Sequence, residues 1–439
     1  ILLLIYFSYA IFIALNLKTG IIPDENTHFV VSKHFSTTIG IPPDVPETYT
    51  LGVYMEQHPY LYYWINGRII NILKFISPSA SDWQILVSLR VINAIYTLGT
   101  VIFCYLFSKE LIKNKWWQLL PVFLLTNTIM FVFLAGGVSY DNLTNLFCMA
   151  GLFFLTRVFN HREFILNSLA WMICIALGTL TKYTVLPLAL VMGVAWIFFS
   201  IRNNKLTLPV IFKGKRDYIF SFILFLLIVG NLAIYGYNLA VYQKFLPPCK
   251  AILTKAQCDL SPFLIRRENY GLDQKLTISA SINLGYPGPI KYFFTLWITA
   301  LFSRIFGVGG HLIYYSLPVT LVHVFLFYWM VLISIIYWRE PRFINISLLG
   351  ILLFYSLVLF LKNYGIELSY GFKTVALQGR YIFPVISIAY ILLTNVLLAA
   401  PRNLIRIPAL VLILTLYFIS GPLTFVLLYN STFSEWFIK

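Results

Sequence analysis

Long apolar segments recur along almost the whole chain and alternate with short polar stretches. A segment of about 20 apolar residues is long enough to cross a hydrocarbon core of roughly 30 Å as a helix. The pattern predicts about eleven such helices, at residues 1–17, 85–107, 117–135, 141–158, 164–181, 183–201, 218–240, 311–337, 343–361, 381–399 and 407–428. We therefore expect an all-α polytopic membrane protein in which residues 1–439 form one membrane-embedded domain.

Two further segments are rich in apolar residues but too polar or too short to span. Residues 60–75, YLYYWINGRIINILKF, are aromatic and apolar with Arg68 and Lys74 interspersed, and residues 290–305 have a similar character. Both patterns are typical of amphipathic helices that lie in the membrane interface. Such helices would frame a cavity open to both lipid and water.

Composition and charge agree with a membrane protein. Of the 439 residues, 59% are hydrophobic and 11% are charged, and the mean hydropathy is +0.81, whereas soluble proteins have about 25% charged residues. The net charge of +16 would suggest nucleic acid in a soluble protein. Here the positive-inside rule and anionic membrane lipids explain it better, and no nucleic-acid partner is expected. Because the chain starts inside an apolar run, we expect an N-terminal stub to be missing.

The short loops divide by charge between two faces. If the N-terminus is cytoplasmic, the inner loops are basic, as the positive-inside rule requires. The opposite face then holds residues 18–84 as the first extracytoplasmic loop, residues 241–310 as a large second loop, and residues 362–380. Most of the carboxylates fall on this outer face or its rim. We therefore expect the chemistry there, with 18–84 as the catalytic loop.

The first outer loop begins with IIPDENTHFV, residues 21–30. Pro23 suits the first position of a helix, and acids in the first turn are favoured by the helix dipole, so an ordinary helix start explains either acid alone. Asp24 and His28, spaced i,i+4, share one face, whereas Glu25 points roughly 100° away. The two carboxylates are therefore expected to do different jobs. A carboxylate beside an apolar wall has a raised pKa, which suits a general base.

EQHPYLYYW, residues 56–64, places Glu56 and His58 just before Pro59. Proline favours an extended approach to the interfacial helix. One interpretation is a polar segment leading into an aromatic belt. In the other, His58 faces a phosphate or a sugar.

Two isolated charges mark the outer ends of later spans. Asp141, in GGVSYDNLTNLF, lies where a tight turn enters a span, and it is either a capping residue or an orienting acid. Lys182, in TKYTVLP, lies at an outer hairpin with almost no polar neighbours in sequence. An ionisable group at such depth suggests a functional site, although snorkelling to the interface also explains it.

LQGRYIFPV, residues 377–385, carries Arg380 at the outer end of a span. Arginine suits bidentate recognition of phosphate, and the adjacent Gly379 would let a ligand approach the backbone. Simple anchoring at the interface is the alternative. Arg90 and the pair Arg266–Arg267 are further cations on this face.

The cysteines give two signals. Cys104, Cys148 and Cys174 lie inside apolar spans and are expected to be packing residues. Cys249 and Cys258 lie in a polar loop, where a disulfide is plausible if the loop faces an oxidising compartment. The sequence holds no P-loop, no dinucleotide-binding fingerprint and no zinc-like spacing, so direct use of a nucleotide is not expected.

Several of these motifs together resemble the GT-C class of membrane glycosyltransferases. PDENTHF resembles the Pro-Asp-Glu-x-x-His-Phe element of a bacterial branch of that class. HPYLYYW is similar to the His/Lys-Pro-Pro-Leu-Tyr-Tyr element of this branch and of lipid A aminoarabinose transferases, with Tyr60 in place of the second proline. SYDNL, FGVGGHLIYYSLP (306–318) and QGRYIFP resemble later elements, in the same order. Protein O-mannosyltransferases are more distant members of the class.

The resemblance implies an inverting transferase that uses a polyprenyl-phosphate-linked sugar, such as an undecaprenyl carrier, on the extracytoplasmic side. An acid of the first outer loop then serves as catalytic base or binds the acceptor, which corresponds to Asp24 and Glu25. The lysine that contacts the donor phosphate in aminoarabinose transferases corresponds to His58, so this role also falls to Lys182 or Arg380. No cofactor follows with certainty, and a divalent metal such as Mg²⁺ or Mn²⁺ stays open.

The resulting expectation is transfer of a hexose such as glucose to a glycan or lipid-linked acceptor, for example O-antigen of lipopolysaccharide or another cell-envelope glycan. The residues expected to contact or orient the acceptor are His28, Asp141, Glu56 and Tyr381. The enzyme would lie in a bacterial inner membrane with its active site facing the periplasm. The alternative, a transporter or flippase of a lipid-linked glycan, predicts broken spans near the midplane and an internal repeat, and the sequence indicates neither.

Overall fold

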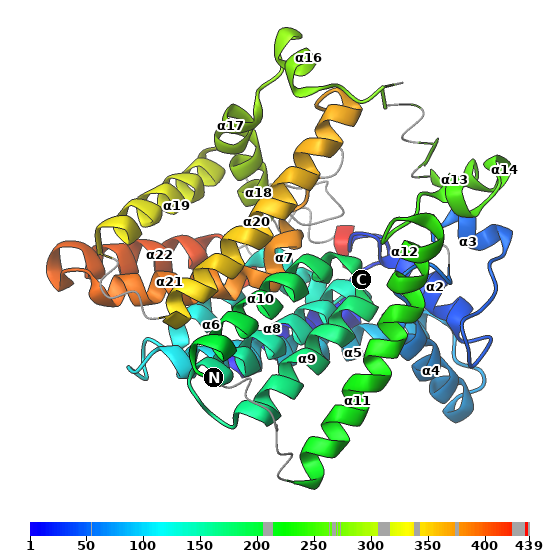
Figure 1. Ribbon diagram of the computed structural model, residues 1–439, viewed down its shortest axis with the longest axis horizontal. Coiled ribbons are helices and arrows are strands. Elements are labelled where there is room, and N and C mark those ends of the chain that lie inside the picture. The colour runs from blue at the N-terminus through cyan, green and yellow to red at the C-terminus, as the bar shows by residue number, and fades with distance from the viewer. Residues whose placement is uncertain are drawn as a thin grey trace.

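A computed structural model of the chain describes residues 1–53, 55–204, 214–262, 264–265, 269, 271–272, 274–305, 317–337, 343–373, 377–423 and 435–437. Within these ranges the chain is helical, with a single β-bridge between Leu17 and Phe437. Nine of the described helices are long and apolar enough to cross a membrane. The predicted all-α polytopic membrane fold is therefore confirmed (Figure 1).

The nine candidate spans are single helices or helices with a short 3₁₀ or π segment. They are α5 (Asp82–Leu111), α8 (Tyr140–Phe159), α9 (Phe164–Thr181), η1 with α10 (Tyr183–Val185 and Leu186–Arg202), α11 with η2 and α12 (Lys215–Asn231, Leu232–Gly236 and Tyr237–Tyr242), α19 (Leu317–Tyr337), α20 (Phe343–Tyr370), η4 with α21 (Gly379–Ile382 and Phe383–Ala399), and η5 with α22 (Arg402–Arg406 and Ile407–Ile419).

Shorter helices complete the described chain. They are α1 (Leu2–Asn16), α2 (Glu25–Phe35), α3 (Pro46–Thr50), α4 (Leu61–Ile76), α6 (Leu119–Thr126), α7 (Ile129–Ala135), α13 (Cys249–Ile252), α14 (Lys255–Cys258), α16 (Ile278–Asn283), α17 (Pro289–Tyr292), η3 (Phe293–Trp297) and α18 (Ile298–Ile305).

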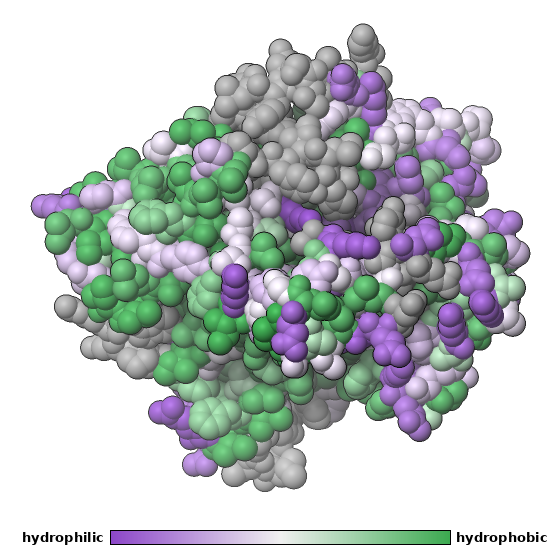
Figure 2. All heavy atoms as spheres, turned by 90° about the horizontal axis from the view of Figure 1, so that it is seen from above, coloured by the Kyte–Doolittle hydropathy of each residue, from purple (hydrophilic) through white to green (hydrophobic). Residues whose placement is uncertain are grey.

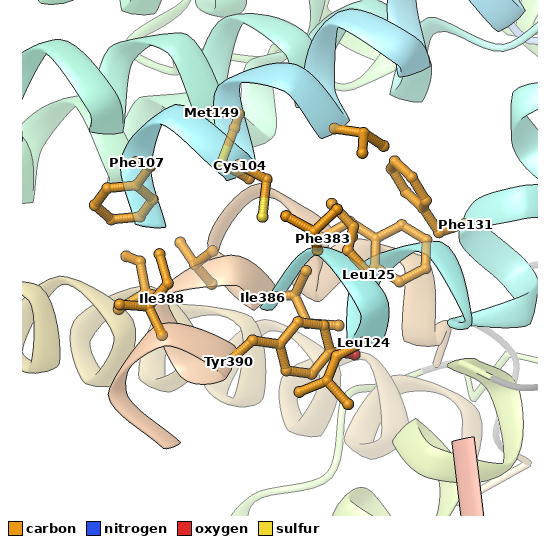
Figure 3. Packing of buried hydrophobic residues seen from close by; sticks show 14 of the residues in the cluster. Cys104, Phe107, Leu124, Leu125, Phe131, Met149, Phe383, Ile386, Ile388 and Tyr390 are labelled. Atoms are coloured by element: carbon orange, nitrogen blue, oxygen red, sulfur yellow. The ribbon is translucent and has the colours of Figure 1, made fainter. Parts of the chain in front are cut away.

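The core lies around α8, which packs against α5 and α9 and is the most buried of the candidate spans. Figure 3 shows how Cys104 of α5 and Met149 of α8 approach the side chains of α6, α7 and α21. Cys104 and Cys148 are buried thiols and Cys174 is half-buried, in agreement with their expected packing role. At the surface, hydrophilic side chains gather toward the side where α2, α3, α4, α13 and α14 lie (Figures 1 and 2).

The continuous helix predicted over residues 117–135 is wrong. The segment forms α6 and α7, separated by Asn127 and by Thr128 in an extended conformation. The Asn127 amide donates to the Phe123 carbonyl at 2.9 Å, and the Thr128 hydroxyl donates to the Leu124 carbonyl at 2.8 Å. Thr128 also shares a hydrogen bond of 2.7 Å with Tyr390 of α21. These polar side chains satisfy the backbone at a buried helix end, which permits the break.

The two predicted amphipathic segments are helical. Residues 61–76 form α4, which buries Tyr62, Tyr63 and Ile70 against α2 and exposes Phe75 at its end. A Cβ at Gly67 would lie 2.7 Å from the Phe35 carbonyl carbon, so glycine permits this close packing. Residues 289–305 form a run of α17, η3 and α18. Their location in the membrane interface stays a prediction. Residues 306–316, Arg266 and Arg267 lie outside the described residues.

Candidate functional site

Four charged side chains that are far apart in sequence meet at one place. Arg380 donates from Nη2 to Asp24 Oδ2 at 2.5 Å, and its Nη1 lies 3.6 Å from Asp141 Oδ2. Lys182 forms an ion pair with the other oxygen of Asp141. We call Asp24, Asp141, Lys182 and Arg380 the charged cluster. The sequence predicted a site role for each, and the structure brings them together.

Every member of the charged cluster lies at or next to a helix start. Asp24 directly precedes α2, Asp141 is in the first turn of α8, Lys182 joins α9 to η1, and Arg380 lies in η4 just before α21. In α8 the cap is Ser139, whose hydroxyl accepts from the Asp141 amide at 3.3 Å. The Asp141 carboxylate is therefore directed to the two cations rather than used as a cap.

Asp24 adopts a left-handed backbone conformation with φ of 63°, and α2 begins at Glu25. The predicted helix start at Pro23 is therefore wrong. A left-handed residue other than glycine is uncommon and costs about 1–3 kcal/mol, although aspartate tolerates it better than most. The Asp24 side chain does not cap α2. Its carboxylate instead meets Arg380, which favours a role in the site over ordinary capping.

Exposure differs sharply within the charged cluster. The Asp24 side chain is 45% exposed, whereas those of Arg380, Asp141 and Lys182 are 4–6% exposed. Arg380 Nε and Nη1 and Asp141 Oδ2 are buried without a hydrogen-bond partner in the described chain. Buried polar atoms usually have partners, and leaving one unpaired costs about 1–3 kcal/mol. The cluster thus presents one accessible carboxylate beside buried guanidinium donors that remain available to an anion.

Glu25 is directed away from the charged cluster and is fully buried. It forms a two-pronged ion pair with Arg90, at 2.8 Å from Nε and 2.5 Å from Nη2, and accepts the Val138 amide at 3.1 Å. Arg90 also donates to the carbonyls of Leu17 and Lys18. Because these contacts saturate the Glu25 carboxylate away from solvent, they favour a positioning role over the predicted catalytic or acceptor-binding one.

Arg90 is the residue whose role the sequence analysis missed. It was noted only as a further cation, yet it is fully buried and ties α5 to the segment that carries Asp24. A signal was present in the sequence, since a charge inside an apolar span needs a partner of opposite charge. The position of Arg90 in the sequence does not identify which of the acids on the predicted outer face is its partner.

His28 is buried next to the charged cluster, close enough to be affected by the charges of all four members. Its Nδ1 lies 2.9 Å from the Tyr63 hydroxyl, and its ring packs edge-on against Tyr140 with centroids 4.4 Å apart. Burial lowers the pKa of His28 to about 4, against the opposing effect of the Asp24 and Asp141 charges. The imidazole is therefore neutral at pH 7, and it acts through hydrogen bonding and packing rather than as a cation.

Aromatic rings surround Lys182. Its ammonium lies 4.5 Å from the centre of the Tyr140 ring and 5.0 Å from that of Tyr381. Such cation–π contacts hold a desolvated ammonium in place. Tyr381 is fixed in turn, because the Tyr355 hydroxyl donates to its carbonyl at 3.1 Å. Tyr381 therefore lines the charged cluster as a positioning group for Lys182.

Glu56 and His58 take no part in the described ion pairs of the charged cluster. The described ion pairs of Lys182 and Arg380 are with Asp24 and Asp141. Glu56 is exposed and His58 half-buried. Burial lowers the pKa of His58 to about 4, so the ring is neutral at pH 7 and is a weaker phosphate ligand than a cation would be.

Gly379 serves packing and not the approach of a ligand, so that prediction is wrong. A Cβ at this position would collide with the backbone of Ile305 and lie 2.8 Å from the carbonyl carbon of Arg304. The end of α18 thus occupies the space beside Gly379. This close contact fixes η4 and with it the direction of the Arg380 side chain.

The segments predicted to be the two large outer loops, residues 18–84 and 241–310, contact each other. Cys249 and Cys258 form a disulfide with Cα atoms 5.9 Å apart, the pairing that the sequence left open. The bond links α13 to α14, and α14 packs against α3 of the first loop. Structural disulfides are typical of oxidising compartments.

The carboxylates of the charged cluster are paired with cations. Asp24 pairs with Arg380, and Asp141 pairs with Lys182. In the part of the chain that the structure describes, no three His, Cys, Asp or Glu side chains are grouped as metal ligands.

Two solved proteins have a backbone trace similar to that of this chain. ArnT from Cupriavidus metallidurans, in a structure bound to undecaprenyl phosphate, has a TM-score of 0.47 at 14% identity, covering 92% of this chain and 60% of its own. The Archaeoglobus fulgidus oligosaccharyltransferase, in a complex with Zn and sulfate, has a TM-score of 0.48 at 13% identity, covering 96% and 54%. This chain thus spans little more than half the length of either protein.

Comparison with curated protein sequences finds no match. The family model described as dolichyl-phosphate-mannose-protein mannosyltransferase matches residues 28–243. The matched region contains Asp141 and Lys182, whereas Asp24 and Arg380 lie outside it. This match confirms the chain's resemblance to the polyprenyl-phosphate-sugar-dependent membrane glycosyltransferases of the GT-C class.

Proposed function

We propose that the protein is an inverting glycosyltransferase that moves a sugar from a polyprenyl-phosphate carrier to an extracytoplasmic glycan acceptor. One observation carries the proposal: an accessible carboxylate, Asp24, is held against a buried arginine, Arg380, whose Nε and Nη1 have no hydrogen-bond partner among the described residues. A base beside a site for an anionic leaving group is what inverting displacement of a phosphate requires. The matched family description names a dolichyl-phosphate sugar, a donor of this chemical class.

In this proposal the donor phosphate binds at Arg380 and Lys182. Arginine suits phosphate because its planar guanidinium donates in parallel to two oxygens. The charged cluster holds two cations and two carboxylates, so its formal charges cancel before the donor binds. A phosphate gives Arg380 a new anionic partner, which releases the Asp24 carboxylate from its ion pair. Binding of the donor thereby prepares the base.

The chemical step then needs one base and one displacement. Asp24 takes the proton from an acceptor hydroxyl while the hydroxyl oxygen attacks the anomeric carbon from the side opposite the phosphate. The bond between the anomeric carbon and the phosphate oxygen breaks, and its electron pair leaves with the polyprenyl phosphate. Arg380 and Lys182 stabilise the charge that grows on that oxygen, usually the largest single contribution to such catalysis.

The other residues have supporting roles. Asp141 fixes both cations, and Glu25 with Arg90 holds the turn that carries Asp24. His28 and Tyr381 line the cluster, whereas Glu56 and His58 are proposed to contact the acceptor or donor at its rim. We further propose a hexose such as glucose, an acceptor such as O-antigen or another envelope glycan, and a periplasm-facing site in a bacterial inner membrane.

The function is tested with the purified protein in proteoliposomes. A panel of undecaprenyl-phosphate hexoses is supplied with candidate glycan acceptors, and the anomeric configuration of the product is read by NMR. We expect transfer from at least one donor with inversion at the anomeric carbon. Net retention would contradict the single-displacement mechanism. Transfer from nucleotide sugars but from none of the lipid-linked donors would contradict the proposed donor class.

A further inference from the structure

Lys362 is an exposed cation on an otherwise apolar face of α20. Leu357 and Leu361, which lie one turn apart on an adjoining side of the helix, are 52% and 57% exposed. The residue lies eight positions before Tyr370, the last residue of α20, which corresponds to about 12 Å along a helix. A lysine in an apolar span usually pairs, lines a functional path or reaches for the interface.

The ammonium of Lys362 is held by an aromatic side chain. It donates to the Tyr183 hydroxyl at 2.5 Å and lies 4.7 Å from the centre of the same ring. Tyr183 directly follows Lys182, a member of the charged cluster. Like Tyr60 and Leu61 at the start of α4, it packs against a small hydrophobic cluster around Tyr235. Tyr183 therefore connects the exposed Lys362, which it contacts, with the buried Lys182, which precedes it in the chain.

The helix that carries Lys362 also forms a wall of the charged cluster. Its Tyr355 donates to the carbonyl of Tyr381, the residue after Arg380. α20 packs along α10, which continues from η1 (Figure 1). α20 thus contacts both short 3₁₀ helices that border the cluster cations, η1 through Lys362 and η4 through Tyr355. Lys362 lies at the exposed lateral edge of this wall.

We propose that Lys362, oriented by Tyr183, is the first contact for the phosphate of a lipid-linked donor that approaches the charged cluster along the exposed side of α20. The inference rests on the proposed function and adds a binding residue to it. An isoprenoid tail is compatible with the apolar face around Leu357 and Leu361, while the phosphate meets the ammonium. The phosphate then passes from Lys362 to the buried pair Lys182 and Arg380. Lys362 is a binding residue in this scheme and takes no part in bond breaking.

The test compares Lys362→Gln, Lys362→Arg and Lys74→Gln in lipid nanodiscs. Lys74 is another exposed lysine, near the end of α4, and is the matched control. Binding of undecaprenyl phosphate is measured by native mass spectrometry, and transfer kinetics are measured on the same samples. We expect Lys362→Gln to weaken binding and raise KM for the donor about tenfold, since one charge-assisted contact is lost. The kcat should stay within about twofold. Lys362→Arg and Lys74→Gln should behave like wild type.

Unchanged binding of undecaprenyl phosphate by Lys362→Gln would overturn the inference, as would equal weakening in Lys74→Gln. Inorganic phosphate is the second probe. We expect millimolar inorganic phosphate to leave lipid binding unchanged, whereas full competition would indicate a site for free phosphate instead. The binding measurement does not require transfer. An absence of transfer from every lipid-linked donor would therefore defeat the proposed function, and unchanged lipid binding by Lys362→Gln would separately defeat this inference.

Discussion

Replacing Asp24 with asparagine is expected to lower kcat for glycosyl transfer by about 10²–10⁴-fold, the usual contribution of a general base. Asparagine has nearly the same size and still accepts a hydrogen bond from Arg380, but it cannot take the proton of an acceptor hydroxyl. Since the Asp24 side chain is 45% exposed, the change should leave the fold intact. The measurement is steady-state transfer in proteoliposomes, with the thermal unfolding midpoint recorded on the same preparation.

Asp82→Asn is the matched control for this change. Asp82 also lies at a helix start on the predicted outer face and pairs with a cation, Lys33, at 2.7 Å, but its side chain is 66% exposed and lies outside the charged cluster. Its turnover should remain within about twofold of wild type, because exposed ion pairs contribute little. Asp24→Asn turnover within the same range would remove Asp24 as the base.

Replacing Arg90 with methionine is expected to lower the free energy of unfolding by about 3–5 kcal/mol, because it leaves Glu25 buried without a cation. Both side chains are fully buried, so water cannot compensate the lost charge. The carbonyls of Leu17 and Lys18 also lose a donor. Denaturant titration of the protein in detergent micelles, followed by tryptophan fluorescence, measures the change.

The double variant Arg90→Met/Glu25→Leu removes both charges. Comparing its free energy of unfolding with that of Arg90→Met distinguishes the loss of the whole ion pair from the loss of one partner. Removing both charges should recover much of the stability, since a buried ion pair and an apolar pair of similar size are often equivalent. A double variant as unstable as Arg90→Met alone would contradict this account. Transfer by the double variant also tests the positioning role, because Glu25 adjoins Asp24. Full activity would show that the Asp24 turn is held by other contacts.

The sequence predicts much of the charged cluster, for a physical reason. In a chain with 11% charged residues, a lone charge at the end of an apolar span is costly and stands out. Asp141, Lys182 and Arg380 met that criterion, whereas Asp24 was recognised as one of two adjacent acids in the first predicted outer loop. The spacing argument also anticipated that the Asp24 and Glu25 carboxylates diverge. It assumed that both residues are helical, whereas Asp24 precedes α2 in a left-handed conformation.

The choice of partners was not predictable from sequence. Glu25 pairs with Arg90 across 65 positions, and Asp24 pairs with Arg380 across 356. Local sequence patterns do not indicate which of the two acids forms an ion pair with which of the two arginines. Tertiary packing decides between them, since α5 brings Arg90 under the first loop while η4, fixed at Gly379 by α18, directs Arg380 to Asp24.

Other features follow from local chemistry that hydropathy does not register. The break between α6 and α7 depends on the Asn127 and Thr128 side chains bonding to backbone carbonyls, within a segment whose average hydropathy is still that of a span. Lys362 drew no notice in the sequence because the predicted span ends at residue 361, so that Lys362 was assigned to the outer segment 362–380, where a charge is ordinary. Only its contact with Tyr183 relates it to the charged cluster.

In the proposed function, the charged cluster binds the leaving phosphate during sugar transfer. A single-turnover assay tests it most directly, by following release of undecaprenyl phosphate from a labelled undecaprenyl-phosphate hexose in wild type and in Arg380→Gln. We predict release by the wild-type protein and release about 10²–10³-fold slower in Arg380→Gln, the usual cost of removing one preorganised donor to a developing anion. Equal release rates in two folded proteins would contradict the account.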